Sequence, residues 1–148
     1  MSITNKIEIT RADTQHRPSI ISLLQKEKLP VEDLPAILSH FLVAMDNDRL
    51  IGVIGLEQYE NSGLLRSMAV DVLYRNRTIA SELVKELEQL AIRTGIHSIY
   101  LLTETASDFF KKKKYEMITR DEVPGSVKAS SEFSSVCPVS AIVMRKLL

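Results

Sequence analysis

The stretch from residue 64 to Gly95 constrains the fold most, because three elements of different character follow one another there. Residues 64–70 are almost entirely apolar, which is typical of a strand in the interior of a sheet. Residues 81–94 carry apolar side chains at helical spacing, and Gly95 stands where a helix C-terminal glycine is expected. The polar turn at residues 75–80 opens that helix. We therefore expect backbone N–H groups at the turn to form a place where phosphates can bind.

The chain before this stretch predicts one strand, two helices and a hairpin. The first strand alternates polar and apolar residues, and the first helix begins near Pro18. Asp33 is a candidate cap for the second helix. The predicted elements are a strand at 6–10, a helix ending near Lys28, a short helix after Pro30 with Leu34, Ile37 and Leu38 on one side, and antiparallel strands at 41–45, 50–56 and 64–70.

The chain after Gly95 predicts a strand that runs parallel to residues 64–70. Residues 96–102 are apolar almost throughout, and a strand–helix–strand unit of this length implies a right-handed parallel crossover. The remaining predicted elements are a helix at 106–113, a strand at 115–119, a polar connection at 121–138 with a helical turn around 127–132, and a last strand at 139–147. That last strand could serve as an interface or form an edge of the sheet. We expect residues 1–148 to form a single domain.

The composition argues against several kinds of binding site. The sequence has 19 Lys plus Arg and 19 Asp plus Glu, so we expect no net field that recruits nucleic acid or an anionic membrane. Cys137 is the only cysteine, which excludes an intramolecular disulfide and a multi-cysteine zinc site. The three histidines lack metal-ligand spacing, so no metal is assigned. With no signal-peptide core and no apolar run of membrane-spanning length, a cytoplasmic location is expected.

The predicted order β-α-α-β-β-β-α-β-α-β-β, an α/β mixed sheet, resembles the GNAT superfamily of acyl-CoA-dependent N-acetyltransferases over nearly the whole chain. Members carry a turn Gln/Arg-x-x-Gly-x-Gly/Ala after the fourth strand, which Arg75 and Ala80 match, while Thr78 replaces the middle glycine. The resemblance implies that acetyl-CoA is the cosubstrate. The threonine methyl could crowd its phosphates, which predicts weakened binding. The cofactor-binding residues implied here are Met68, Ala69, Val70, Arg75, Asn76, Arg77, Thr78, Ile79 and Ala80.

A second segment of the chain resembles the family pattern Asn-x-x-Ala-x-x-Phe-Tyr-x-x-x-Gly-Phe. The matching positions are Thr103, Ala106, Phe109, Phe110, Lys114 and Tyr115. The first four join the implied cofactor-binding set. In many relatives the tyrosine protonates the departing thiolate, and here that position is Phe110. A thiol with a pKa near 8.5 leaves as a tolerable thiolate at neutral pH, so we expect the chemistry to survive. Tyr115 is expected to pack, or alternatively to replace the missing acid.

Glu57 and Arg66 are the candidate catalytic residues. Glu57 follows an apolar run, and the turn near residue 61 places it roughly opposite Arg66. Because an unpaired charge in so apolar a strand costs several kcal/mol, Arg66 needs a partner. One alternative is a structural Glu57–Arg66 ion pair. In the other, Glu57 is the general base and Arg66 receives a carboxylate of the substrate.

Residues 132–144, 64–67 and 101–106 resemble the GNAT branch associated with arsenic resistance. That association identifies no acceptor, and the single Cys137 does not support arsenic binding. The function expected is transfer of acetyl from acetyl-CoA to the primary amine of a small molecule, such as an amino acid or an amino-acid-like toxin. The alternative is an acyl-CoA sensor or a catalytically weak relative, because of Thr78 and Phe110. Relatives are frequently homodimers, which leaves a homodimer open.

Overall fold

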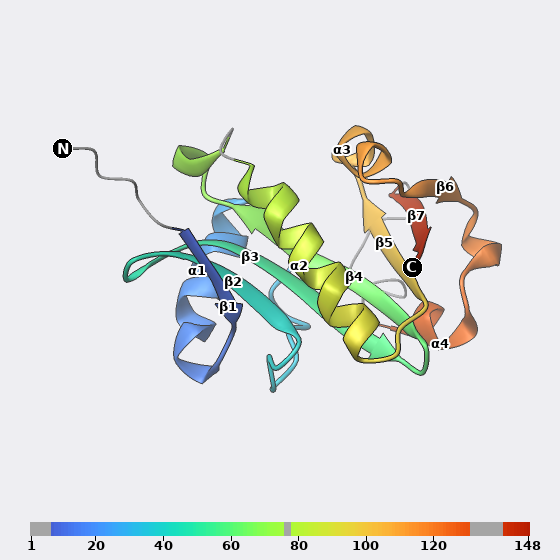
Figure 1. The fold of residues 1–148 in the computed structure, drawn as a ribbon, viewed down its shortest axis with the longest axis horizontal. Helices are drawn as coiled ribbons and strands as arrows, with labels where there is room; N and C mark the ends of the chain where they lie inside the picture. The colour runs from blue at the N-terminus through green and yellow to red at the C-terminus, as the bar shows by residue number, and fades with distance from the viewer. Residues whose placement is uncertain (1–6, 76–77, 131–140) are drawn as a thin grey trace. The chain divides into compact units, whose positions relative to one another are not determined.

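The computed structural model describes residues 7–75, 78–130 and 141–148 and contains a seven-stranded mixed sheet in the order β1-β2-β3-β4-β5-β7-β6 (Figure 1). The predicted α/β class with a mixed sheet is therefore confirmed. Asn76, Arg77 and Cys137 lie outside the described residues. The strands are β1 Ile7–Arg11, β2 Phe41–Asp46, β3 Arg49–Tyr59, β4 Ser62–Val70, β5 Ser98–Thr103, β6 Glu116–Ile118 and β7 Ile142–Leu147.

The helices are few and mostly short. The α-helices are α1 Arg17–Lys26, α2 Ile79–Arg93, α3 Ser107–Lys112 and α4 Gly125–Lys128, and the 3-10 helices are η1 Thr14–His16, η2 Val72–Tyr74 and η3 Arg120–Glu122. None of the helices in the described part of the chain has the length and apolar character needed to cross a membrane. The chain packs as two compact units. The first unit is Met1–Gly55 with Ser67–Leu87, and the second is Leu56–Arg66 with Glu88–Leu148.

In the first unit, β1, β2 and the start of β3 form an antiparallel sheet against which α1 packs. Ile9 pairs with Ala44, and Val43 pairs with Val53 across the predicted hairpin. Gly55 is required here because a Cβ at that position would lie 2.5 Å from the ring of Phe41. The buried core cluster of this unit is Ala12, Ile20, Leu23, Leu24, Leu34, Leu38, Phe41, Val43, Val53 and Ala69.

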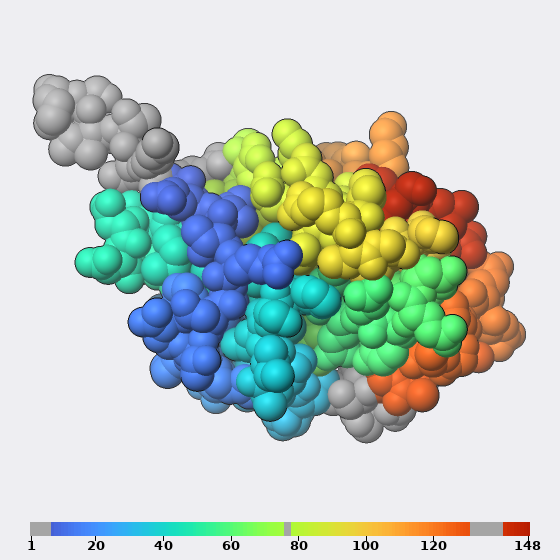
Figure 2. All heavy atoms as spheres, turned by 60° about the horizontal axis from the view of Figure 1, so that its bottom comes forward, coloured from blue at the N-terminus to red at the C-terminus, as the bar shows by residue number. Residues whose placement is uncertain are grey.

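The prediction of a second helix after Pro30 is wrong. No helix lies between α1 and β2, and residues 29–40 form turns at the surface beside α1 (Figure 2). Pro35 disfavours helical geometry at Leu34, and the Arg17 guanidinium donates to the carbonyl oxygen of Pro35 at 2.6 Å. Leu34 and Leu38 are buried as expected, whereas Ile37 is 77% exposed. The apolar pattern therefore predicts the burial of Leu34 and Leu38 correctly, although these residues do not lie in a helix.

In the second unit, the first part of β4 runs parallel to β5, as predicted, with Ser62 paired to Ser98 and Leu64 to Tyr100. Gly95 has a φ of 85°, the left-handed conformation expected of a glycine that ends a helix. The prediction that the last strand could be an edge is wrong, since β7 pairs with β5 on one side and β6 on the other. The helical turn of the long connection is α4, which begins after Pro124 and earlier than predicted.

Candidate active site

Glu57 and Arg66 form an ion pair in the second unit, as the sequence predicted for a buried arginine. Arg66 Nη1 donates to Glu57 Oε2 at 2.7 Å, and the Arg66 side chain is 0% exposed against 17% for Glu57. The hydroxyl of Tyr59 donates to Glu57 Oε1 at 2.5 Å. Both oxygens of the carboxylate therefore have a hydrogen-bond donor. Glu57, the candidate base, and Tyr59 are both partly exposed, whereas Arg66 is buried.

Tyr59 is a site residue that the sequence did not single out. Burial is the largest cause that raises the pKa of Tyr59 above its ordinary range, and the hydrogen bond to Glu57 acts in the same direction. A hydrogen bond with Ser130 and the charge of Arg66 oppose these effects. The phenol therefore keeps its proton at neutral pH and remains a hydrogen-bond donor. The alternation of β3 could have found Tyr59, because residues two apart in a strand share a face.

The end of β4 lies in the first unit and carries Met68, Ala69 and Val70, three of the predicted cofactor residues. Just before them, Ser67 has a φ of 57°, a left-handed conformation inside a strand. Such a residue interrupts the regular pairing of a strand and turns the adjacent backbone groups out of the ladder. The sequence carries no glycine at this point that could have indicated the irregularity.

Asp71 organises the turn that follows β4. Its Oδ1 accepts from the backbone N–H of Leu73 at 2.9 Å, which caps η2. Arg49 Nη2 donates to Asp71 Oδ2 at 3.3 Å, and the N–H of Asp71 donates to the carbonyl oxygen of Ile51. The hydrogen bond from Leu73 is the main cause that lowers the pKa of Asp71. Asp71 therefore stays ionised and stabilises η2, the turn that precedes Arg75.

Thr78 adopts a left-handed backbone conformation, with φ of 60°, at the position where the family pattern has glycine. Its carbonyl oxygen accepts from the N–H of Glu82 at 3.0 Å, which begins the hydrogen bonding of α2. Ile79 and Ala80 occupy the first turn of that helix, where N–H groups lack partners within the helix. A β-branched residue is strained at this φ. The turn thus keeps a glycine-like backbone without a glycine.

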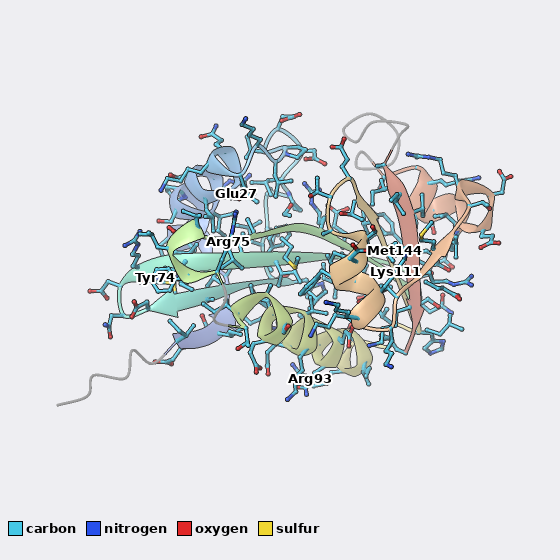
Figure 3. The ribbon with its side chains drawn as sticks, turned by 90° about the horizontal axis from the view of Figure 1, so that it is seen from above. Glu27, Tyr74, Arg75, Arg93, Lys111 and Met144 are labelled. Carbon is cyan, nitrogen blue, oxygen red and sulfur yellow. The ribbon has the colours of Figure 1, made fainter. Side chains whose placement is uncertain are left out.

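Arg75, the first residue of the predicted phosphate turn, is ion-paired in this structure. Its guanidinium is bonded to the carboxylate of Glu27, which ends α1 (Figure 3). Both residues belong to the first unit, and the Arg75 side chain is 51% exposed. An exposed guanidinium so close to the start of α2 remains within the region predicted to bind phosphate. Glu27 gave no signal in the sequence because the pairing spans elements far apart in the chain.

The second predicted segment lies in the second unit. Thr103 Oγ1 accepts from the N–H of Ala106 at 3.0 Å, which fixes the entry to α3. The rings of Phe109 and Phe110 meet edge to face at 5.1 Å between centroids. Phe110 is 3% exposed and its ring centroid lies 5.3 Å from that of Tyr115. Phe110 is therefore a core residue of this unit.

Tyr115 is held by a polar cluster beneath α3. Its hydroxyl donates to Glu88 Oε2 at 3.0 Å, and Lys146 Nζ donates to Glu88 Oε1 at 2.9 Å. Burial and the neighbouring Glu88 raise the pKa of Tyr115 far above its ordinary range. The phenolic proton is thus engaged by a carboxylate of α2. These contacts support the prediction that Tyr115 packs rather than replaces the missing acid.

The predicted residues divide between the two units. Met68 to Val70, Arg75 and Thr78 to Ala80 belong to the first, whereas Glu57, Arg66, Thr103, Ala106, Phe109 and Phe110 belong to the second. A hollow of about 590 Å³ in the first unit lies between α1, the β2–β3 hairpin and Asp71, and contains none of the predicted site residues. Within the described part of the chain, no group of three or more His, Cys, Asp or Glu is placed to hold a metal ion.

Known proteins resemble this chain in sequence. The model of the acetyltransferase (GNAT) family matches residues 11–114. An N-acetyltransferase of Chlorobaculum tepidum, itself named as uncharacterized, is 29% identical over 101 residues. The aligned part is 68% of this chain, and it spans 64% of that relative's length.

Solved structures resemble this chain in fold. N-acetylglutamate synthase of Neisseria gonorrhoeae, complexed with coenzyme A and N-acetyl-glutamate, has a TM-score of 0.83 at 15% identity, covering 99% of this chain but 36% of its own. The Mycobacterium tuberculosis protein Rv2747, in complex with CoA and NLQ, has a TM-score of 0.81 at 22% identity, covering 95% and 99% of the two chains. A Staphylococcus aureus acetyltransferase of the GNAT family has a TM-score of 0.78 at 23% identity, covering 97% and 99%. Since the family model spans most of the sequence, this chain belongs to the GNAT family of acetyltransferases.

Proposed function

We propose that this protein is an N-acetyltransferase that moves acetyl from acetyl-CoA to the primary amine of a small molecule. The observation that carries the proposal is the backbone of Thr78, which keeps a left-handed conformation at the glycine position of the phosphate turn. Glycine is commonly found where a chain needs that conformation close to a ligand. The solved relatives named above with coenzyme A support the same cosubstrate class.

The residues of the first unit fit the phosphate end of such a cosubstrate. Ile79 and Ala80 contribute N–H groups at the start of a fifteen-residue helix, where the helix dipole favours an anion. Arg75 adds an exposed guanidinium, and we assign Asn76 and Arg77 to the same role from the sequence alone. Met68, Ala69 and Val70 are proposed to hold the pantetheine arm through their backbone. Bound acetyl-CoA supplies the activated thioester.

The second unit supplies the proposed acid–base chemistry. Glu57 accepts a proton from the amine, directly or through a water, which gives a neutral nucleophile. The amine nitrogen then forms a bond to the acetyl carbon, the bond from that carbon to sulfur breaks, and the nitrogen releases its second proton to water, which leaves a neutral amide. Phe110 carries no exchangeable proton, so the thiolate leaves as the anion and takes its proton from water. Thr103, Ala106 and Phe109 are proposed to line the cosubstrate beside Phe110.

Two roles are compatible with Arg66. Because its side chain is wholly buried and already bonded to Glu57, we propose that it holds the Glu57 carboxylate in a fixed orientation. The other role, reception of a substrate carboxylate, needs the guanidinium to become accessible. An acceptor panel with matched amines that carry or lack a carboxylate discriminates between these roles. Arg66 as a carboxylate receptor predicts a strong preference for the acidic member of each pair.

A second candidate function is an acyl-CoA sensor with little or no transfer activity. The burial of Phe110 against Tyr115 favours it, because no phenol stands at that position. Calorimetric titration with acetyl-CoA, beside a thiol-release assay on a broad panel of small amines, separates the two functions. Binding with thiol release supports the enzyme, and binding without it supports the sensor. Absence of binding contradicts both.

The association with arsenic resistance, the cellular location and the oligomeric state are also part of the proposal. The resemblance to the arsenic-resistance branch rests partly on residues 132–140, which lie outside the described residues, and it identifies no acceptor. Growth of a deletion strain on arsenical compounds, with and without the gene, tests that association. A cytoplasmic location and a homodimer are predicted from the sequence, and light scattering of the purified chain tests the homodimer.

A further inference from the structure

We propose that Tyr74 and Asp46 are positioning residues for the phosphate turn at residues 75–80: their hydrogen bond fixes this turn to the β2–β3 hairpin. Loss of the hydrogen bond is expected to weaken the binding of acetyl-CoA through its phosphates. This role rests on the proposed function, in which residues 75–80 hold those phosphates. Neither residue matches a position of the family patterns, and both lie in the first unit with the described part of the turn.

The 3-10 helix η2, which leads into the phosphate turn, is not anchored by apolar burial. None of its residues is buried, and Val72 and Leu73 are 63% and 69% exposed. A 3-10 helix also has poorer hydrogen-bond geometry than an α-helix, so a single turn of it is weak by itself. The position of η2 therefore depends on the polar contacts at its two ends, made by Asp71 and Tyr74.

The first end of η2 is attached to β3. The N–H of Asp71 donates to the carbonyl oxygen of Ile51 at 2.8 Å, and Asp71 Oδ2 accepts from Arg49 at 3.3 Å. The Arg49 side chain is 52% exposed, and exposed ion pairs are weak. The backbone hydrogen bond is therefore the firmer attachment at this end.

The second end of η2 is attached to both strands of the same hairpin. The hydroxyl of Tyr74 donates to Oδ2 of Asp46, the last residue of β2, at 2.5 Å (Figure 3). A hydrogen bond from a hydroxyl to a carboxylate is charge-assisted and about twice as strong as a neutral one. The guanidinium carbon of Arg49, which is paired with Asp46 across the hairpin, lies 5.7 Å from the centre of the Tyr74 ring, within the range of a cation–π contact.

The surroundings of the Asp46 carboxylate make this contact hard to replace. Within the described part of the chain, Oδ1 of Asp46 is buried and has no hydrogen-bond partner. Removal of the Tyr74 hydroxyl would take away the donor to Oδ2 as well. Because a buried acceptor without a donor is costly, the carboxylate is then expected to turn toward water and away from η2. The hydrogen bond therefore keeps Tyr74 on the hairpin.

The position of η2 matters for the phosphates because Arg75 follows Tyr74 directly. The N–H of Arg75 donates to the carbonyl oxygen of Val72 at 3.4 Å, which ties the backbone of Arg75 to η2. Hydrogen bonds weaken steeply when their angle departs from linear, so N–H groups bind a phosphate well only when they are held in place. A displaced η2 therefore moves Arg75 and changes the path of the chain into α2, where the phosphates are proposed to bind.

Isothermal titration calorimetry with acetyl-CoA tests this role in Tyr74→Phe and Asp46→Ala. The Kd is expected to rise about three- to tenfold in each variant, because η2 loses one charge-assisted hydrogen bond to the hairpin. The double variant is expected to bind as well as either single variant, since both changes remove the same hydrogen bond. Asp46→Asn keeps an acceptor for the hydroxyl and is expected to retain most of the affinity.

A second ligand distinguishes positioning of the phosphate turn from a general loss of structure. S-acetylpantetheine has the thioester and the pantetheine arm but no phosphate, and its affinity, measured by ligand-observed NMR, is expected to be the same in Tyr74→Phe as in the wild type. Glu116→Gln weakens an ion pair with Arg145 in the second unit and serves as the control for stability. It is expected to leave the Kd for acetyl-CoA unchanged, even where urea denaturation shows a less stable chain.

The possible results separate this role from the proposed function. Wild-type binding of acetyl-CoA that changes in neither Tyr74→Phe nor Asp46→Ala overturns the positioning role alone. An equal loss of affinity for acetyl-CoA and S-acetylpantetheine overturns it as well, because the effect is then not carried by the phosphates. Absence of acetyl-CoA binding in the wild type contradicts the proposed function, and the positioning role with it.

Discussion

The guanidinium of Arg75, in the proposed phosphate turn, is bonded to the carboxylate of Glu27 at the end of α1. Figure 3 shows the two labelled residues side by side, from elements far apart in the chain. Glu27 also follows the negative end of the α1 dipole, which favours a cation there. If Arg75 binds a coenzyme phosphate, as we propose, that phosphate competes with Glu27 for the guanidinium.

Replacing Glu27 should strengthen acetyl-CoA binding. Exposed ion pairs are worth about 0–1 kcal/mol, so release of Arg75 in Glu27→Gln is expected to lower the Kd by at most about fivefold. Isothermal titration calorimetry at low ionic strength measures the change. Glu8→Gln, at an exposed position of β1, makes the same charge change without touching Arg75 and serves as the control. A Kd that rises in Glu27→Gln instead assigns Glu27 an orienting role.

Thr78→Gly should stabilise the fold and tighten acetyl-CoA binding together. A left-handed conformation costs a non-glycine residue about 1–2 kcal/mol, and part of this is offset by the entropy that glycine loses on folding. We expect the free energy of unfolding to rise by about 1 kcal/mol in urea denaturation. Removal of the methyl group should also relieve crowding of the phosphates, which lowers the Kd.

The control for this variant is Thr119→Gly. Thr119 is exposed and has a φ of −89°, an extended conformation that any residue adopts. Glycine at that position should destabilise the chain. Increased stability of Thr78→Gly without a lower Kd would keep the strain argument and refute the crowding argument. An unchanged stability contradicts the strain itself.

Lys114 occupies the glycine position of the second family segment and has a φ of 76°. The N–H groups of Lys114 and Tyr115 donate to the carbonyl oxygens of Lys111 and Phe110, the two bonds of a Schellman motif. Lys114→Gly is therefore expected to raise the free energy of unfolding by about 1 kcal/mol. Lys111→Gly, inside α3, should lower it by about the same amount. Thermal unfolding of the two variants, read by circular dichroism, must give shifts of opposite sign.

The elements governed by local pattern were predictable from the sequence. The β2–β3 hairpin, the helix that ends before Gly95 and the parallel pairing of Leu64 with Tyr100 follow from periodicity, turn residues and crossover length. The helix predicted within residues 29–40 is absent because long-range contacts override local propensity. Arg17 binds the carbonyl oxygen of Pro35 across eighteen positions, and no pattern near Pro35 records that contact.

The candidate site was predictable where charge had to be balanced. A buried Arg66 demanded a partner, and the turn near residue 61 indicated Glu57. Tyr59 was missed although it lies two residues from Glu57 on the same face of β3, because the sequence does not mark which neighbour donates to a carboxylate. The strain at Thr78 and Lys114 was missed for another reason. A substitution at a glycine position reveals that glycine is absent but not whether the backbone conformation has changed.

Asp71 should make stability depend on pH in the acidic range. Because its pKa is lowered in the folded state, mainly by the hydrogen bond from Leu73, the stabilisation is fully present above the unfolded-state pKa and is lost as pH falls through the folded-state pKa. Asp71→Asn keeps an acceptor for the cap but removes the charge opposite Arg49. We expect it to lower the free energy of unfolding at pH 7 by about 1 kcal/mol, and by less as pH falls below about 4.

Urea denaturation of the wild type and Asp71→Asn between pH 7 and pH 2.5 measures this dependence. The two stability curves should converge at the acidic end, because the wild-type carboxyl is then neutral as well. Asp48→Asn, at an exposed turn position of the same unit, removes one negative charge without removing a cap and controls for net charge. Two curves that stay the same distance apart at every pH would contradict the prediction, because the charge of Asp71 would then contribute nothing to the free energy of unfolding.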